Sequence, residues 1–384
     1  MKRDVLHPAV IFPLVWGITI AAIALAQLFG YFQLSVGALL LFTIGNVFFV
    51  MGALISRGSP EKNKNVLICD LNFKKIVWFC IALHCIFLPL SWVEIHKIAA
   101  GAEDVFATAY RLRAASSSGE ETVGPLVGNY LLAGLFFVPL LLIGWMQREI
   151  KSLTLGALAA PWVFLNILIA GRSGLIALFF SLFYIYISRG GKVKLKSSLL
   201  FGGGFVVILI AGNLLVGKID AGIDDGAISI FRQSSKSFFD YFLQGPILFS
   251  EYFNRPNLVN PTWDALIFPC HVLEKFKLCA LPSQHQGFMN FSQNGDTGNV
   301  YSIFFSIYPK YGWLGVIFLI CGYGFWATFH HLRRSLTIFH LLIASFLFSA
   351  ILLSVFADSF GPSIYFFSKI FIINLAASFA FKKT

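Results

Sequence analysis

Long apolar stretches alternate with short polar segments along most of the chain. Ten of these stretches have the composition of helices that cross a hydrocarbon layer roughly 30 Å thick, which takes about 20 residues of helix. They cover residues 10–30, 33–55, 76–93, 125–146, 153–170, 175–187, 198–216, 312–329, 337–356 and 364–381. The pattern therefore predicts an all-α polytopic membrane protein with about ten transmembrane helices and with both termini on one side.

Composition and charge agree with this prediction. Of the 384 residues, 57% are hydrophobic and only 12% are charged, and the mean hydropathy is +0.77, which is more apolar than soluble domains are. More than half of the 29 Lys and Arg residues lie on one predicted side, in residues 1–8, 57–75, 147–152, 188–198, 330–335 and 382–384. Positive charge marks the cytoplasmic side, so both termini are predicted to be cytoplasmic. The net charge of +11 then reflects topology and not nucleic-acid binding.

The predicted spans and loops divide the chain into five parts. These are the first three spans, a first outer loop, spans four to seven, a large outer loop and the last three spans, at residues 1–93, 94–124, 125–216, 217–311 and 312–384. Connections as long as the two outer loops are usually functional. In the large loop, Cys270 and Cys279 could form a disulfide in an oxidising compartment, or could bind zinc together with His271 and His285.

Arg172 is an isolated charge within the apolar sequence IAGRSGL. The predicted spans place it in a short outer turn at residues 171–174, between the fifth and sixth spans. An ionisable residue near membrane depth suggests a functional site, because its insertion is unfavourable. The alternative is an arginine whose long side chain reaches the lipid headgroups.

A second group of charges lies in the large outer loop, in the sequence FRQSSKSFFDYFLQG. On a helix, Arg232, Lys236, Asp240 and Gln244 form one polar row opposite an aromatic face, which predicts an interfacial helix. The alternative is a solvated row of charges that pair with one another. After Pro246 comes a further charged pair, Glu251 and Arg255, whose members are also four residues apart.

Cations at the outer membrane surface suit a phosphate ligand, because guanidinium groups bind phosphate oxygens in a bidentate manner. A lipid-linked pyrophosphate is therefore the predicted substrate. Its candidate binding residues are Arg172, Arg232, Lys236 and Arg255.

The sequence TGNVYSIFFSIYPKYGWLG, residues 297–315, leads from the large loop into a late span. Together with the AGRSG turn, it resembles the O-antigen polymerase and ligase superfamily of bacterial envelopes. Asn299, Tyr301, Gly312 and Gly315 match that family's Asn-aromatic segment and its G-x-x-G span entry. Ligases typically carry His immediately before the Asn, and this chain has Gly298 there, which favours a polymerase. Residues 113–124 also fit an Arg-x10-Gly pattern described for some polymerases.

The resemblance implies a GT-C-like fold in the bacterial inner membrane with its active face in the periplasm. The implied reaction is glycosyl transfer between oligosaccharides linked to undecaprenyl pyrophosphate. No metal ion or other cofactor is implied. The implied partners are these lipid-linked oligosaccharides, membrane lipid and a chain-length regulator protein. The alternatives are an O-antigen ligase and a lipid-linked oligosaccharide flippase.

The catalytic base must reach a sugar hydroxyl from the outer side. Its candidates are Asp240, Glu251, His285 and Asp296, each of which could equally be a surface or salt-bridge residue.

Four other sets of polar or aromatic residues have structural interpretations. We expect His84, in the third span, to make an interhelical hydrogen bond. Asp358 and Lys369 could form a structural pair or line a lipid entry, and His330 and His331 are expected to form a cytoplasmic basic flank. The remaining set could stack on sugars or form the interfacial aromatic belt, and comprises Trp263, Tyr308, Tyr311 and Trp313.

Overall fold

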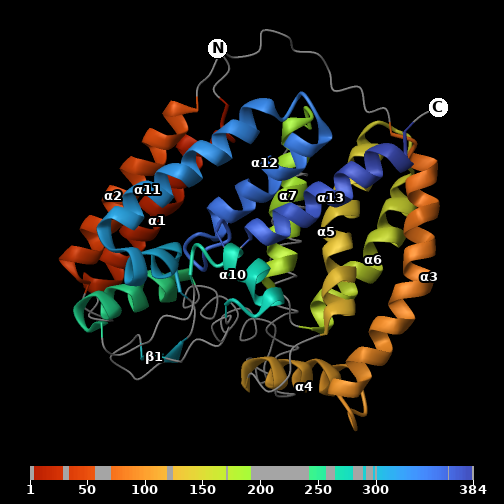
Figure 1. The fold of residues 1–384 in the computed structure, drawn as a ribbon, viewed down its shortest axis with the longest axis horizontal. Coiled ribbons are helices and arrows are strands. Elements are labelled where there is room, and N and C mark those ends of the chain that lie inside the picture. Colours follow the sequence, from red (N-terminus) through yellow and green to blue (C-terminus); the bar gives the residue numbers. More distant parts are fainter. Residues whose placement is uncertain are drawn as a thin grey trace. The chain divides into compact units, whose positions relative to one another are not determined.

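The computed structural model describes most of the chain (Figure 1). The described residues are 4–28, 34–56, 71–118, 124–169, 172–191, 242–256, 264–279, 289–290, 297–298, 301–361 and 363–382. Contacts divide the chain into two compact units, one made of Met1–Leu67 with Ser237–Phe371 and the other of Ile68–Lys236 with Ile372–Thr384. We call them the first and the second unit.

Helices account for almost all of the described secondary structure. Five are long and apolar enough to cross a membrane: α1 (Pro8–Leu28), α2 (Val36–Ile55), α3 (Phe73–Ile98), α5 (Pro125–Met146) and α11 (Ile303–Arg333). Four apolar helices are shorter: α6 (Ser152–Leu168), α7 (Arg172–Ser188), α12 (Ile338–Leu353) and α13 (Ile364–Ala380). The prediction of a helical membrane protein is thus confirmed, although only five of the described helices have full spanning length.

The predicted spans coincide with these helices, apart from the one at 198–216, which lies outside the described residues. Two boundaries were predicted wrongly. Helix α3 continues through Ile98, five residues into the predicted first outer loop, and that loop contains a further helix, α4 (Val105–Ser118). Helix α11 begins at Ile303, within the predicted large outer loop.

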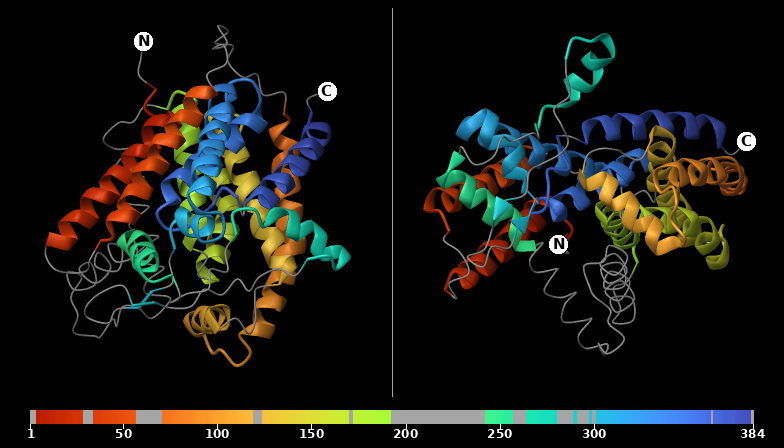
Figure 2. Two further views of the ribbon diagram at one scale, coloured as in Figure 1. Left: turned by 60° about the vertical axis from the view of Figure 1, so that its left-hand side comes forward. Right: turned by 90° about the horizontal axis from the view of Figure 1, so that it is seen from below.

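Helices α1, α2 and α11 lie side by side in the first unit (Figures 1 and 2). Glycines allow α2 and α11 to approach closely: a Cβ on Gly52 would overlap the carbonyl of Cys321, and one on Gly324 would overlap the carbonyl of Phe49. Such contacts are favoured between membrane helices, where tight packing replaces the hydrophobic effect as the driving force.

Helix α11 is interrupted at Gly312. Its φ of 60° and ψ of −156° are not helical, and a positive φ of this kind favours glycine. Gly315 follows, and a Cβ there would overlap Tyr311, which lies just before the break. The two glycines of the predicted span entry therefore permit a break between a short helix at 303–311 and a longer one at 313–333.

The described residues of the predicted large outer loop add several small elements to the first unit. A helix covers residues 242–254, so Pro246 lies inside it. Helix α10 (Phe268–Leu273) is followed by the 3₁₀ turn η2 (Glu274–Phe276). Strands β1 (Met289–Asn290) and β2 (Thr297–Gly298) form a short antiparallel pair.

The second unit holds α3 to α7, and His84 lies among them. Its Nδ1 lies 2.6 Å from the Tyr130 hydroxyl and its Nε2 lies 2.9 Å from the Leu158 carbonyl oxygen. Because a carbonyl only accepts, Nε2 donates, and Nδ1 then accepts from Tyr130. The predicted interhelical hydrogen bond of His84 is confirmed.

The end of α11 differs from the predicted basic flank. His331 is only 1% exposed, and its Nε2 lies 2.9 Å from Asp4 Oδ2, which also accepts from Arg334 at 2.6 Å. His330 is buried beside His340, with 3.0 Å between their Nδ1 atoms. Burial alone would raise the pKa of Asp4, but the bonds from His331 and Arg334 lower it overall. These histidines therefore pack inside the first unit.

We expect Gly324→Ala to destabilise the protein, because the new Cβ must push α2 away from α11 (overpacking costs about 1–3 kcal/mol). Gly322→Ala is the matched control on the same helix, since a Cβ there meets nothing within 4 Å. Thermal unfolding in detergent should give a lower midpoint for Gly324→Ala and an unchanged or higher one for Gly322→Ala. Equal midpoints would contradict the close packing.

Candidate functional site

Many of the predicted site residues lie outside the described residues. These are Arg232, Lys236, Asp240, His285, Asp296 and Asn299. For Arg172 the backbone is described: α6 ends at Leu168 and α7 begins at Arg172, so residues 172–174 of the predicted turn belong to the first turn of α7. Glu251, Arg255 and Tyr301 remain, and all three belong to the first unit.

Glu251 and Arg255 lie at the end of the helix over residues 242–254. Glu251 is half-buried and Arg255 is exposed, and the Arg255 N–H donates to the Glu251 carbonyl at 3.0 Å, one helical turn back. The same helix is fastened to the start of α2, because the Ser35 N–H donates to the Ser250 hydroxyl at 2.6 Å. A Cβ on Gly37 would overlap Phe253. This part of the large loop thus packs directly on a membrane helix.

Tyr301 lies just before the short helix at 303–311. It is 5% exposed, and its ring centroid lies 4.3 Å from that of Phe305. Burial raises the pKa of Tyr301 to about 12, so its hydroxyl stays protonated at neutral pH. Next to it, the Ile303 N–H donates to the Ser354 carbonyl at 2.8 Å, which attaches the start of α11 to the end of α12.

The carboxylate of Asp358 accepts four hydrogen bonds in the connection between α12 and α13. The Ser306 and Tyr323 hydroxyls donate to Oδ2 at 2.7 and 3.2 Å. The N–H groups of Phe360 and Gly361 donate to Oδ1 at 2.8 and 3.2 Å. Ser306 precedes the break at Gly312 and Tyr323 follows it. Asp358 therefore ties the two parts of α11 to the connection, which agrees with a structural role.

A second carboxylate, Asp264, holds the C-terminal end of the short helix. Its Oδ2 pairs with Lys310, and its Oδ1 accepts from the Tyr311 hydroxyl at 2.5 Å. Burial alone would raise the pKa of Asp264, but the bonds from Lys310 and Tyr311 lower it overall. The adjacent Ala265 N–H donates to the Ser306 carbonyl at 3.1 Å. Asp264 and Asp358 thus hold residues 301–311 from two sides.

The aromatic residues near the break pack on one another. Phe253 and Tyr308 are stacked with 5.2 Å between ring centroids, and Trp313 meets both rings edge-on. Tyr308 and Trp313 are half-buried, so each leaves part of its ring exposed. Trp263 lies outside the described residues.

Cys270 and Cys279 form a disulfide, with 5.4 Å between their Cα atoms. The predicted pairing is therefore confirmed. Zinc coordination by these two cysteines was the wrong alternative, because a disulfide has no thiolate to offer.

Gly124 has a structural reason for being glycine. A Cβ there would overlap the Glu94 carboxylate, whose Oε2 accepts the Val127 N–H at 3.1 Å in the first turn of α5. A carboxylate at this position also matches the positive end of the helix dipole. Packing against Glu94 thus explains why the Arg-x10-Gly pattern at residues 113–124 ends in a glycine.

Sequence reasoning missed Asp264 and did not identify the partners of Asp358. Asp264 is 46 residues from Lys310, and Asp358 is 52 residues from Ser306. No local pattern links such distant positions.

No family model, curated protein or solved structure matches the chain. The class that the fold defines is therefore the general one, a helical membrane protein.

We expect Asp358→Ala to be strongly destabilising, because two hydroxyls and two buried N–H groups lose their acceptor (each buried unsatisfied group costs about 1–3 kcal/mol). Asp358→Asn keeps one oxygen for the N–H groups and offers an amide to the hydroxyl oxygens, so it should retain most of the stability. Thermal unfolding in detergent measures both variants. Equal losses of stability in the two variants would show that the charge of Asp358 matters and not the geometry of its hydrogen bonds.

Stability should depend on Asp264 in a pH-dependent way. Its pKa is lower in the folded state than the usual 3.8, so its contribution is present above that pH and is lost as pH falls through the folded value. At pH 7 we expect Asp264→Asn to be less stable by about 1–2 kcal/mol. The gap between wild type and variant should persist at pH 5 and close below pH 3.8. A gap that is constant down to acid pH would contradict this assignment.

Proposed function

We propose that the protein is an O-antigen polymerase that transfers a growing glycan from undecaprenyl pyrophosphate to a new lipid-linked repeat unit at the periplasmic face of the inner membrane. The observation that carries the proposal is the break at Gly312, within the segment that resembles the O-antigen polymerase and ligase superfamily. Gly312 and Gly315, the glycines of that segment, allow a non-helical backbone conformation that a regular transmembrane helix does not need. The residues before the break are held by two carboxylates, as expected of a segment that must keep a defined position.

In the proposed reaction, a hydroxyl at the non-reducing end of the new repeat unit attacks the anomeric carbon of the growing chain. The bond between that carbon and the pyrophosphate oxygen breaks, and undecaprenyl pyrophosphate leaves with the bonding electrons. The hydroxyl proton passes to a base. Negative charge therefore develops on the pyrophosphate, and preorganised cations stabilise it.

Arg172 is the proposed main contact of the leaving group. It is the first residue of α7, so its charge adds to the positive end of the helix dipole. Arg232, Lys236 and Arg255 are the other proposed cations. They take the place of a metal ion in neutralising the pyrophosphate.

Glu251 is the proposed base among the described candidates. It is half-buried in a helix that packs on α2, and Arg255 follows it by one turn. Asp240, His285 and Asp296 remain alternative bases. Asp264 and Asp358 are assigned a positioning role, because their oxygens already accept hydrogen bonds from protein donors.

The experiment is a gel profile of surface polysaccharide from a host that lacks this gene, together with extraction of its lipid-linked intermediates. Collapse of the ladder to one repeat unit supports a polymerase, since repeats are still exported and attached. Accumulation of long, unattached lipid-linked polymer would identify a ligase. Loss of all repeats from the outer side would identify a transporter.

In the same host, complementation with Arg172→Glu should leave the ladder collapsed. A preorganised charge contact in the transition state is worth about 10²–10³-fold in rate. Arg172→Lys should restore shorter chains, because it keeps the charge and loses the bidentate geometry. Lys151→Glu, a charge reversal at the opposite end of α6, should restore the full ladder. Normal chain length with Arg172→Glu, at equal protein levels, would rule out the assigned role.

A further inference from the structure

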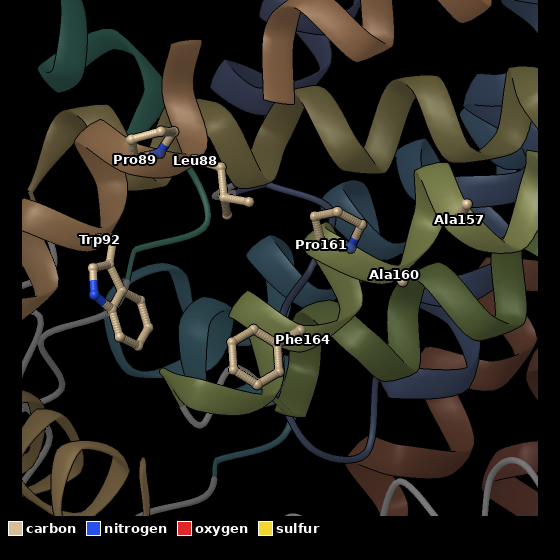
Figure 3. A pocket seen from close by; sticks show the side chains of 7 residues that line it. All are labelled: Leu88, Pro89, Trp92, Ala157, Ala160, Pro161 and Phe164. Atoms are coloured by element: carbon tan, nitrogen blue, oxygen red, sulfur yellow. The ribbon is translucent and has the colours of Figure 1, made fainter. Parts of the chain in front are cut away.

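An apolar groove lies between α3 and α6 in the second unit. It is an open surface groove with a volume of about 540 Å³, lined by Leu88, Pro89, Trp92, Ala157, Ala160, Pro161 and Phe164 (Figure 3). The figure shows Trp92 and Phe164 towards one end and Ala157 towards the other. The volume falls within the range of roughly 300–1,000 Å³ that is usual for small-molecule sites.

Small residues and prolines create this space. The short side chains of Ala157 and Ala160 leave room on the α6 side of the groove. Pro89 and Pro161 each remove a helix hydrogen bond and disturb the helix locally. The lining contains no side chain able to hold water by several hydrogen bonds, so an apolar occupant is required to fill it. Both helices are apolar, and hydrocarbon chains surround them in a bilayer.

Two basic residues follow the groove residues of α3 in the last turn of that helix. Leu88, Trp92 and His96 follow one another at helical spacing along α3, and the His96 ring meets the Trp92 ring edge-on, with 4.9 Å between centroids. His96 and Lys97 occupy the last turn of α3 and are both exposed. The nearest carboxylate in the sequence, Glu94, is engaged by the first turn of α5.

We propose that this groove binds an anionic phospholipid of the outer leaflet, with one acyl chain between α3 and α6 and with the phosphate beside His96 and Lys97. A tryptophan followed by basic residues is the arrangement expected where an apolar chain meets a headgroup. Charge complementarity with the basic side chain of Lys97 selects an anionic headgroup. The residues of this site are other than the proposed pyrophosphate cations, and lipid binding here requires no turnover.

The test uses full-length protein in vesicles of three parts phosphatidylcholine to one part phosphatidylglycerol. The phosphatidylglycerol carries a photoreactive group in its acyl chain, and labelled peptides are mapped by mass spectrometry. Peptides containing Trp92 and Ala160 should be labelled more than the exposed apolar residues of α2, such as Leu40 and Val47. Uniform labelling of these helices would overturn the proposal.

Two variants separate the chain contact from the headgroup contact. Ala160→Leu fills the groove and should lower its labelling about tenfold. Gly156→Leu is the matched control, since a Cβ at Gly156 meets nothing within 4 Å, and it should leave the labelling unchanged. Lys97→Gln lies outside the groove and avoids any packing change. It should lower labelling by phosphatidylglycerol and not by a phosphatidylcholine probe, whereas Lys277→Gln should change neither.

Competition identifies the occupant. Unlabelled phosphatidylglycerol should displace the probe from the groove. Displacement by undecaprenyl phosphate, with phosphatidylglycerol ineffective, would overturn the phospholipid assignment in favour of a polyprenyl lipid. Equal labelling by both probes in wild type and Lys97→Gln would overturn the headgroup contact. None of these outcomes depends on polymer length, so they are separate from the test of glycosyl transfer.

Discussion

Backbone N–H and C=O groups must find partners within the protein wherever lipid replaces water, and this constraint shapes the whole chain. Regular helices meet it automatically, and side chains can supply partners where a helix begins, ends or contains a proline. At the α12–α13 connection, Asp358 accepts two backbone N–H groups. Near Pro161, His84 donates to the Leu158 carbonyl. At the start of α5, Glu94 accepts an N–H of the first turn. Most of the polar side chains placed among these apolar helices thus serve the backbone.

The helices could largely be predicted from the sequence, because insertion into lipid depends on local composition. The same local signal began a span at residue 312, where α11 is interrupted, but it did not predict the short helix before the break. It also assigned His331 to a basic flank, although the partner that explains its burial, Asp4, is 327 residues away. Hydropathy reports the preference of a segment for lipid, and it carries no information on which segments meet.

The residues of the candidate site could likewise be predicted from the sequence only in part. The glycines of the resembling segment could be recognised from short spacings, and the structure gives them a physical reason at Gly312 and Gly315. The carboxylates that hold this segment could not be recognised, because each comes from a distant part of the chain. The contacts that hold residues 301–311 therefore come from tertiary structure, whereas the glycines at the break, Gly312 and Gly315, can be recognised in the local sequence.

The bond between Ser306 and Asp358 also has a consequence for biosynthesis. The two residues are 52 positions apart, and a ribosome adds roughly 5–20 residues per second. Residues 301–311 are thus synthesised several seconds before the carboxylate that fixes them. During that interval the hydroxyl of Ser306 must bond elsewhere, and the final arrangement of residues 301–311 waits for the connection that follows α12.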